Sequence, residues 1–323
     1  MHFPAISLVF CLLIFQPPVY GQLDYKFYDS TCPNLTRIVR FGLWSAMAND
    51  TRIAASLLRL HFHDCISNGC DASILLDETS SFSSEKDALP NRNSARGFEL
   101  IESIKANVEK TCPNTVSCID ILTLAVREAV FLTGGPYYLL ALGRRDGLTA
   151  NITAANTEIP SPFEPLDNII AKFTAKDLNL KDVVALSGAH TIGFAKCFAF
   201  KFRLFNFSGS GGPDPSLDAS FASSLQTACP NQDDSDNKLV PLDPVTKMRF
   251  DNIFFKNLVN NSGVLASDQA LMSDNRTQTM VLNYSKYPSL FAKDFSDSMV
   301  KLSNVGVITG QNGQVRNKCN LVN

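Results

Sequence analysis

Eight cysteines, spread along almost the whole chain, constrain its fold more than any other feature. They follow a short apolar leader, and a ninth cysteine, Cys11, lies inside that leader. An even number of cysteines in an exported chain predicts disulfide bonds, which tie distant segments together. Composition and spacing alone do not select among the possible pairings. The eight are Cys32, Cys65, Cys70, Cys112, Cys118, Cys197, Cys229 and Cys319.

The first 21 residues predict that the chain is exported. Residues 5–15 form an apolar run, and Val19-Tyr20-Gly21 offers a small-residue cleavage site, as in a secretory signal peptide. The run is shorter than the ~20 residues that span a bilayer, and no later segment is long enough either. We therefore predict a signal peptide at 1–21, one domain at 22–323, and secretion to the extracellular space.

The net charge and the glycosylation signals agree with an exported protein. The net charge is −2 and no basic stripe is present, so nucleic acid is not an expected partner. Seven Asn-x-Ser/Thr sequons mark positions where an exported chain can carry glycans. They begin at Asn34, Asn49, Asn151, Asn206, Asn260, Asn275 and Asn283.

The hydrophobic periodicity is mostly helical, with long loops rich in Gly, Pro, Ser and Asp between the periodic segments. The strongest short strand signal is at 138–142. The expected fold is therefore mainly α with long ordered loops. Helices are expected from 53 toward 63 after a cap at Asn49-Asp50-Thr51, at 97–110, at 119–131 after a Ser117 cap, from Thr174 or Asp177 to Ser187, at 250–259 and at 295–302, with loops at 76–96, 150–166, 206–218 and 229–244.

An arginine and a histidine lie one helical turn apart in Arg59-Leu60-His61-Phe62-His63-Asp64-Cys65. Positions four apart share one face of a helix, so Arg59 and His63 are expected to point into one cavity. That pair suits peroxide cleavage: an imidazole moves the proton from the near oxygen to the leaving oxygen, and a fixed cation stabilises the developing charge. The alternative is a surface arginine beside a structural core histidine.

His61 and His63 together resemble a zinc or copper pair, but helical geometry argues against it. Positions two apart on a helix differ by ~200° in azimuth, so the two imidazoles face opposite ways. His61 is expected to be structural.

A second isolated histidine follows in Leu186-Ser187-Gly188-Ala189-His190-Thr191. A lone buried histidine is more often structural than a ligand. Paired with the Arg59–His63 segment, however, His190 suits a haem-iron ligand, which usually donates its other N–H to an acceptor. Ser267-Asp268-Gln269 is a candidate source of that acceptor, although composition does not select Asp268 from the other acids.

Beyond these segments, the whole chain after residue 21 resembles the class III secretory plant peroxidases, the horseradish peroxidase family. Several motifs in the same order carry the resemblance, and together they are highly specific. They are RLHFHDC at 59–65, GCDASILLD at 69–77, EKD at 85–87, NSARGF at 93–98, SCIDIL at 117–122, GRRDG at 143–147, LSGAHTIG at 186–193, FDN at 250–252 and SDQAL at 267–271.

The resemblance implies a haem peroxidase fold: a helical, two-lobed single unit with one haem b between a distal and a proximal half. It assigns roles to six residues. His63 is the distal acid/base, Arg59 stabilises the transition state, Asn91 keeps His63 basic, Phe62 forms the distal wall, His190 is the iron ligand and Asp268 is its hydrogen-bond partner.

The resemblance also implies two calcium ions, held by oxygen ligands next to the two histidines. Ser67, Gly69 and Arg249 are expected to contribute only their carbonyls. The distal ion is expected to bind Asp64, Ser67, Gly69, Asp71 and Ser73, with Glu85 through water. The proximal ion is expected to bind Thr191, Asp243, Thr246, Arg249 and Asp251. Read without the family, such Asp-x-Ser clusters are ordinary loop caps.

Four disulfides follow from the same resemblance: Cys32–Cys112, Cys65–Cys70, Cys118–Cys319 and Cys197–Cys229. Pro160 matches the proline that contacts the donor, and Phe163 lies near it. Glu164 and Ala199, however, occupy positions where some members have an aromatic residue.

The expected function is that of a secreted, monomeric haem peroxidase. It would reduce hydrogen peroxide to water and oxidise phenols or other small aromatic donors by one electron each, in lignin or phenolic oxidation and the response to oxidative stress. Two alternatives are a secreted glycoprotein that binds calcium or wall polymers without catalysis, and a haem-free metalloenzyme built on His61 and His63. The first need not keep Arg59, His63 and Asn91, all of which are present.

Overall fold

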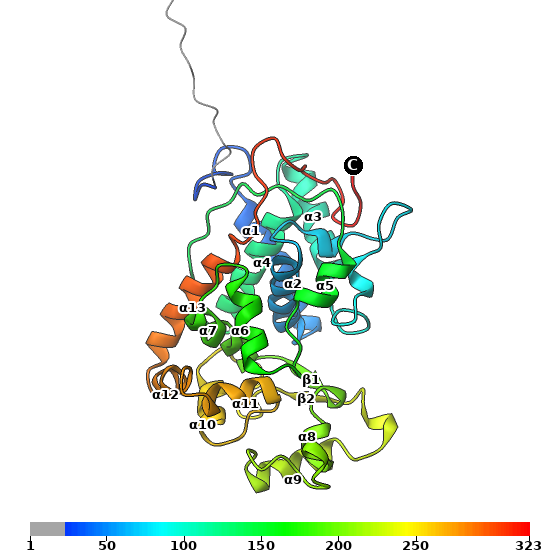
Figure 1. Cartoon of the computed structure of the whole chain (residues 1–323). Coiled ribbons are helices and arrows are strands. Elements are labelled where there is room, and N and C mark those ends of the chain that lie inside the picture. The colour runs from blue at the N-terminus through cyan, green and yellow to red at the C-terminus, as the bar shows by residue number, and fades with distance from the viewer. Residues whose placement is uncertain (1–22) are drawn as a thin grey trace, which may run out of the picture.

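The structure is a computed structural model that describes residues 23–323. Within this range it contains thirteen α-helices and two three-residue strands, so the mainly α fold expected from the sequence is confirmed (Figure 1). The signal peptide predicted at 1–21, with Cys11, lies outside the described residues. No helix of the described part is both long and apolar enough to cross a membrane.

The first half of the chain forms a group of four long helices. Helix α1 buries Leu35, Val39 and Leu43, which recur every four residues and therefore share one face. Helix α4 is buried along nearly its whole length, and Ser117 caps it as predicted by accepting from the Asp120 N–H at 3.3 Å. Helix α2 packs against α4, and α1 packs against both α3 and α4. The bounds are α1 Leu35–Asn49, α2 Ile53–Ser67, α3 Phe98–Thr111 and α4 Cys118–Leu132.

The second half adds a layer of shorter helices. Helix α7 packs against α6 and α13, while α10 packs against α11 and α12 (Figure 1). One continuous hydrophobic core runs from the four long helices into this layer. The bounds are α5 Ile152–Glu158, α6 Leu166–Thr174, α7 Leu180–Ser187, α10 Ile253–Val259, α11 Ala266–Ser273, α12 Gln278–Lys286 and α13 Pro288–Leu302.

A small unit at the opposite end from α1 and α3 has its own core (Figure 1). Strand β1 (Phe194–Lys196) pairs antiparallel with β2 (Leu239–Pro241), with Ala195 opposite Val240. Helices α8 (Phe202–Phe205) and α9 (Ala219–Ala228) pack together beside them. Short 3-10 helices complete the fold: η1 Ser73–Leu75, η2 Glu85–Asp87, η3 Gly188–Thr191, η4 Cys197–Ala199, η5 Phe207–Gly209 and η6 Asp233–Ser235.

Several element boundaries differ from the sequence predictions. Helix α7 begins at Leu180, not near Thr174 or Asp177, because Asn179 and Asp182 form a reciprocal capping box there. Asp177 has a positive φ of 59°, which ends the preceding helical segment. Helix α13 begins seven residues before 295, at Pro288, whose fixed φ suits a first helical position.

The remaining differences concern α2, α10, one strand and two loops. Helix α2 begins at Ile53 as predicted, but its N-cap is Arg52, which makes no side-chain capping bond, and not a residue of 49–51; Asp50 accepts from the Arg52 N–H at 3.0 Å. Helix α10 begins at Ile253, three residues after the predicted start. Segment 138–142 is not a strand: only Leu142 forms an isolated bridge, with Asp24. The predicted loops at 150–166 and 229–244 contain α5 and β2, respectively.

Candidate functional site

The Arg59–His63 pair lies on one face of α2, as the four-residue spacing predicts. The Arg59 Nε donates to the His63 Nε2 at 3.3 Å. The Arg59 Nη2 donates to the Pro90 carbonyl at 2.5 Å and to the Ser94 Oγ at 3.0 Å, which fixes the guanidinium. Burial lowers the pKa of Arg59 to about 10, so it remains a cation at neutral pH.

His63 is held as a neutral base. Its Nδ1 lies 2.5 Å from the Asn91 Oδ1, and the Asn91 Nδ2 donates to the Glu85 carbonyl at 2.8 Å. The amide oxygen is an acceptor, so the proton of the imidazole is on Nδ1 and Nε2 keeps its lone pair. Burial and the charge of Arg59 lower the pKa of His63 to about 3. The imidazole that faces Arg59 therefore stays unprotonated over a wide pH range.

His190 is held by a buried carboxylate from a distant helix. It lies in η3, directly after α7, and its Nδ1 is 2.9 Å from the Oδ1 of Asp268 in the first turn of α11. Burial lowers the pKa of His190, but the charge and hydrogen bond of Asp268 outweigh this and raise it. The charge of Arg59 acts on His190 in the opposite direction and lowers its pKa.

The His190 environment fits a histidine-ligated haem iron. The carboxylate occupies Nδ1 and leaves Nε2 free, while the side chain is still 39% exposed, whereas that of Asp268 is only 4% exposed. A fixed imidazole with a free Nε2 is the donor that haem iron requires. The Phe254 ring packs edge-on against the His190 imidazole. The Phe62 ring contacts both His63 and Phe173.

The residues predicted for a distal calcium site converge at the end of α2. Asp64 and Glu85 are fully buried, and Asp71 is nearly so. The Asp64 Oδ2 accepts from the Ala72 N–H at 3.0 Å, and the Asp71 Oδ1 accepts from the Ser73 N–H at 2.9 Å. Burial together with the charges of Asp71 and Glu85 raises the pKa of Asp64 well above its usual range. Three acids this close would be stabilised by a cation.

Unpartnered oxygen atoms point to the same cation. The Ser73 Oγ and the Glu85 Oε2 are buried without a hydrogen-bond partner, which is costly unless another group satisfies them. Ser67 donates its hydroxyl to the His63 carbonyl at 2.6 Å, and its own carbonyl accepts from the Lys176 Nζ at 3.3 Å. Gly69 has a φ of 100° and lies against the Gly306 backbone, so a side chain would not fit there.

The proximal set also comes together. The Thr191 Oγ1 and the Thr246 Oγ1 donate to the Asp251 Oδ1 at 3.3 and 3.1 Å, and Thr246 also reaches the Asp243 Oδ2 at 2.9 Å. Hydroxyls and carboxylates of this kind are the ligands that Ca²⁺ prefers. The Arg249 guanidinium is a cation without an acceptor, so only the Arg249 carbonyl could contribute.

All four expected disulfides are present: Cys32–Cys112, Cys65–Cys70, Cys118–Cys319 and Cys197–Cys229. The alternative metal pair is not formed, because His61 points away from His63 and its Nε2 lies 3.1 Å from the Ser303 Oγ. His61 does cluster with Cys65 and Cys70, but their sulfurs are bonded to each other and are not free thiolates.

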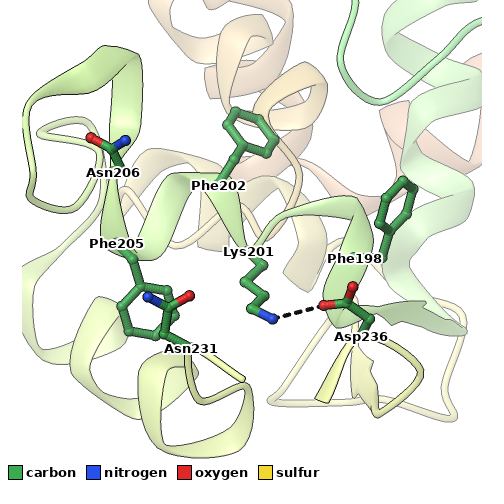
Figure 2. A pocket seen from close by; sticks show the side chains of 7 residues that line it. All are labelled: Phe198, Lys201, Phe202, Phe205, Asn206, Asn231 and Asp236. Atoms are coloured by element: carbon green, nitrogen blue, oxygen red, sulfur yellow. Dashed lines mark hydrogen bonds and ion pairs between the residues drawn. The ribbon is translucent and has the colours of Figure 1, made fainter. Parts of the chain in front are cut away.

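Two aromatic residues near the predicted donor contact were missed from the sequence. Pro160 follows α5 and is half-buried, and Phe163 lies three residues further on. The Phe163 ring contacts Phe198 and Phe202, with centroids 5.6 and 5.5 Å apart. Phe198 and Phe202 also line the pocket shown in Figure 2. The four-residue spacing of Phe198 and Phe202 would place them on one face of a helix, but the segment lacks helical periodicity, so the sequence did not predict that they lie together.

Comparison with known proteins agrees with this geometry. The sequence profile of the family described as Peroxidase matches residues 39–287. The chain is 60% identical to Peroxidase 10 of Arabidopsis thaliana over 301 residues, which is 93% of this chain and 86% of that protein. It is 52% identical to Peroxidase N of Armoracia rusticana over 323 residues, 99% and 97% of the two chains.

A third relative, a lignin-forming anionic peroxidase of Nicotiana sylvestris, is 48% identical over 322 residues, which is 99% of this chain and 98% of that protein. The family match covers well over half of the chain, and these relatives align along nearly all of it. The chain therefore belongs to the peroxidase family, as a plant class III haem peroxidase that acts on hydrogen peroxide.

Proposed function

We propose that His63 is the acid/base and Arg59 the fixed cation for the peroxide reaction, and that His190 holds the haem iron with Asp268 behind it. The observation that carries this assignment is the His63 Nε2, whose lone pair faces the Arg59 guanidinium while its Nδ1 is held by Asn91. When bound, haem would store the two oxidising equivalents taken from peroxide, and two donor molecules would then return one electron each.

The residues on α2 then have separate tasks. His63 takes the proton from the near oxygen of peroxide at Nε2 and returns it to the leaving oxygen as water forms. Arg59, anchored by Pro90 and Ser94, stabilises the negative charge that develops on that oxygen. Asn91 keeps the imidazole in the tautomer that leaves Nε2 basic. Phe62 forms the apolar wall beside them.

The proximal pair sets the electron density at the iron. Asp268 is almost fully buried and accepts the hydrogen bond from the His190 Nδ1, which makes the imidazole a stronger donor through Nε2.

Two calcium ions would brace the two faces of the haem site. The distal ion would bind Asp64, Asp71 and Ser73 with the carbonyls of Ser67 and Gly69, and Glu85 through water. The proximal ion would bind Thr191, Asp243, Thr246 and Asp251 with the carbonyl of Arg249. Support comes from the buried acids and orphaned oxygens of the first set and the convergence of the second.

We further propose a single domain at 22–323 in a monomeric, glycosylated protein secreted to the extracellular space or cell wall, which oxidises phenolic donors at Pro160. A lignin-forming relative and six exposed sequon asparagines support this proposal; Asn283, the seventh, is half-buried and the poorest glycan acceptor.

Substitution of His63 by alanine tests the catalytic assignment. The variant is expected to keep its Soret absorption but to slow the peroxide step by roughly 10²–10⁴-fold, the usual effect of losing a general acid/base. Stopped-flow absorption after mixing with peroxide measures this. His61→Gln is the matched control, because His61 faces away from Arg59 and should leave the step unchanged. A parent-like rate in His63→Ala would refute the role of His63, and loss of the haem would make His63 a ligand instead.

A further inference from the structure

Three phenylalanines form an exposed aromatic surface next to the Pro160 segment. Phe163, Phe198 and Phe202 are 48%, 62% and 38% exposed, and Phe163 contacts both of the others. Exposed large apolar side chains that cluster, rather than scatter, usually mark an interaction site. We call these three rings the phenyl platform.

The platform is built on a rigid base. Phe200, which lies between two platform residues in the sequence, is fully buried in the small core, so Phe198 and Phe202 point outward while it points in. The Phe198 N–H donates to the Asp236 carbonyl at 3.1 Å, and the neighbouring Cys197 is bonded to Cys229. The two rings therefore project from backbone that is fixed before any ligand arrives.

A cavity of about 310 Å³ adjoins the platform and shares Phe198 and Phe202 with it (Figure 2). This volume is at the small end of the range for ligand pockets. Lys201 lies between the two rings in the sequence, but its Nζ is bound to the Asp236 Oδ1 at 2.8 Å and to the Gln232 carbonyl at 2.6 Å. Its charge is thus already paired.

The charged side chain next to Phe163 is paired as well. Glu164, next to Phe163, binds the Nζ of Lys172 at 2.6 Å. An anion finds no free cation in these two pairs, and the Glu164 Oε2, which is buried without a hydrogen-bond partner, would repel one. The chemistry of the surface therefore favours an uncharged aromatic occupant over an aromatic acid.

The size of the platform argues against a second copy of the chain. With roughly 200 Å² per phenylalanine, the exposed parts of the three rings amount to roughly 300 Å², well below the ~800 Å² per partner of a stable interface. The surface is instead comparable to one or two aromatic rings of a small molecule.

We propose that the phenyl platform docks uncharged phenolic donors of two or more rings, with the reacting ring at Pro160 and the following ring packed against Phe163, Phe198 and Phe202. This inference rests on the proposed donor contact at Pro160, with which the platform is continuous through Phe163. Single-ring donors reach Pro160 without touching Phe198 or Phe202, so the platform selects for donor length.

The test compares two donors at saturating peroxide: guaiacol, which has one ring, and a guaiacyl β-ether dimer, which has two. Phe198→Ala should lower kcat/KM for the dimer about twofold to tenfold, the range of one lost aromatic contact, mainly through KM. It should leave guaiacol unchanged. Phe198→Tyr keeps the ring and should behave like the parent. Phe41→Ala, which removes an equally exposed ring from α1, should change neither donor.

Each other outcome has a definite meaning. A dimer-to-guaiacol ratio equal to that of the parent in both Phe198→Ala and Phe202→Ala overturns the platform. An equal loss for both donors overturns it too, because the platform is then not selective. Sedimentation that shows a parent dimer and a monomeric Phe198→Ala variant would make the surface an interface between copies. If His63→Ala keeps the parent peroxide rate, it is the proposed function that fails, whatever the donor ratio.

Discussion

At the residue scale, burial decides what each histidine can do. His61 and His63 lie on one helix, and the pKa of each is lowered to about 3, chiefly by burial. His61 lies next to the Ser303 Oγ and the Cys65 Sγ, and the charge of Arg144 lowers its pKa further. His190 differs because Asp268 raises its pKa. The two neutral histidines should therefore make folding sensitive to acid.

Substitution of His61 by glutamine should reduce the loss of stability in acid. The pKa of His61 is near 6.5 in the unfolded chain and about 3 in the folded one. Between these two pH values only the unfolded state binds the extra proton. The contribution of neutral His61 to the free energy of unfolding is therefore complete above pH 6.5 and is lost as the pH falls toward 3. One such group gives a slope of about 1.4 kcal/mol per pH unit.

The measurement is the free energy of unfolding in urea at a series of pH values from 7 to 4, with parent and variant compared at each. The free energy of unfolding of the parent should fall more steeply with pH than that of the His61→Gln variant, so any advantage of the parent at pH 7 should shrink or reverse as the pH falls. A constant difference across the series would show that His61 takes up its proton equally in the folded and unfolded states.

At the element scale, the end of α2, η1 and η2 form one unit around the buried acids. The Glu85 carbonyl accepts from Asn91, and Asn91 holds His63, so the acid cluster is linked to the base by two hydrogen bonds. The Glu85 Oε1 also accepts from the Asn151 N–H at 2.9 Å, which ties the start of α5 to the same unit. A cation at this cluster would fix the position of His63 without touching it.

Removal of calcium should therefore slow the peroxide step before the helices unfold. Treatment with a chelator leaves Asp64, Asp71 and Glu85 with uncompensated repulsion, and the loop between α2 and η2 should loosen. Stopped-flow absorption measures the peroxide step, far-ultraviolet circular dichroism measures the helix content, and elemental analysis measures the bound calcium. Restored calcium should raise Tm with concentration, since a ligand that binds only the native state stabilises by mass action. Active enzyme that contains no calcium would remove both sites from the proposal.

At the scale of the whole molecule, the C-terminal segment closes the distal half. Arg316 is fully buried and donates to the carbonyls of Ala72, Cys319 and Gly147 at 2.8–3.0 Å. Cys319 is bonded to Cys118 at the start of α4, across 201 residues of sequence. The disulfide thus keeps Arg316 against the loop that carries Asp71.

Replacement of Cys118 and Cys319 by serine should release this segment and accelerate loss of the distal calcium. The cost in stability should be about 5 kcal/mol by the loop-entropy estimate, against about 4 kcal/mol for the shorter Cys197–Cys229 loop. The matched control is the Cys197→Ser, Cys229→Ser pair, which lies in the small unit with α8 and α9 and should leave calcium release unchanged. Chelator-induced calcium release, followed with a fluorescent indicator, separates the two. Equal release rates in both variants would contradict the proposed closure.

The sequence by itself determined the features that depend on neighbours along the chain. Arg59 and His63 share a face because they are four residues apart on a helix, and Ser117 caps α4 because its hydroxyl reaches the Asp120 N–H. The motifs from 59 to 271 indicated the family, which the comparisons confirm, and with it the four disulfides that the structure contains. The spacing of neighbouring residues and the order of the motifs can be obtained from the sequence, so these predictions did not require knowledge of the fold.

For distant groups that no motif pairs, only the tertiary structure decides which ones meet. Asp268, which only the family resemblance had named, reaches His190 across 78 residues because α10 packs against both η3 and α11. Phe198 and Phe202 join Phe163 because the small unit lies beside the α5–α6 connection, so aromatic contacts that looked sparse in sequence are present in space. Segment 138–142 has strand-like residues but no partner strand, and α7 begins where a capping box closes. Pairing and packing energies depend on contacts between distant segments, which no local pattern contains.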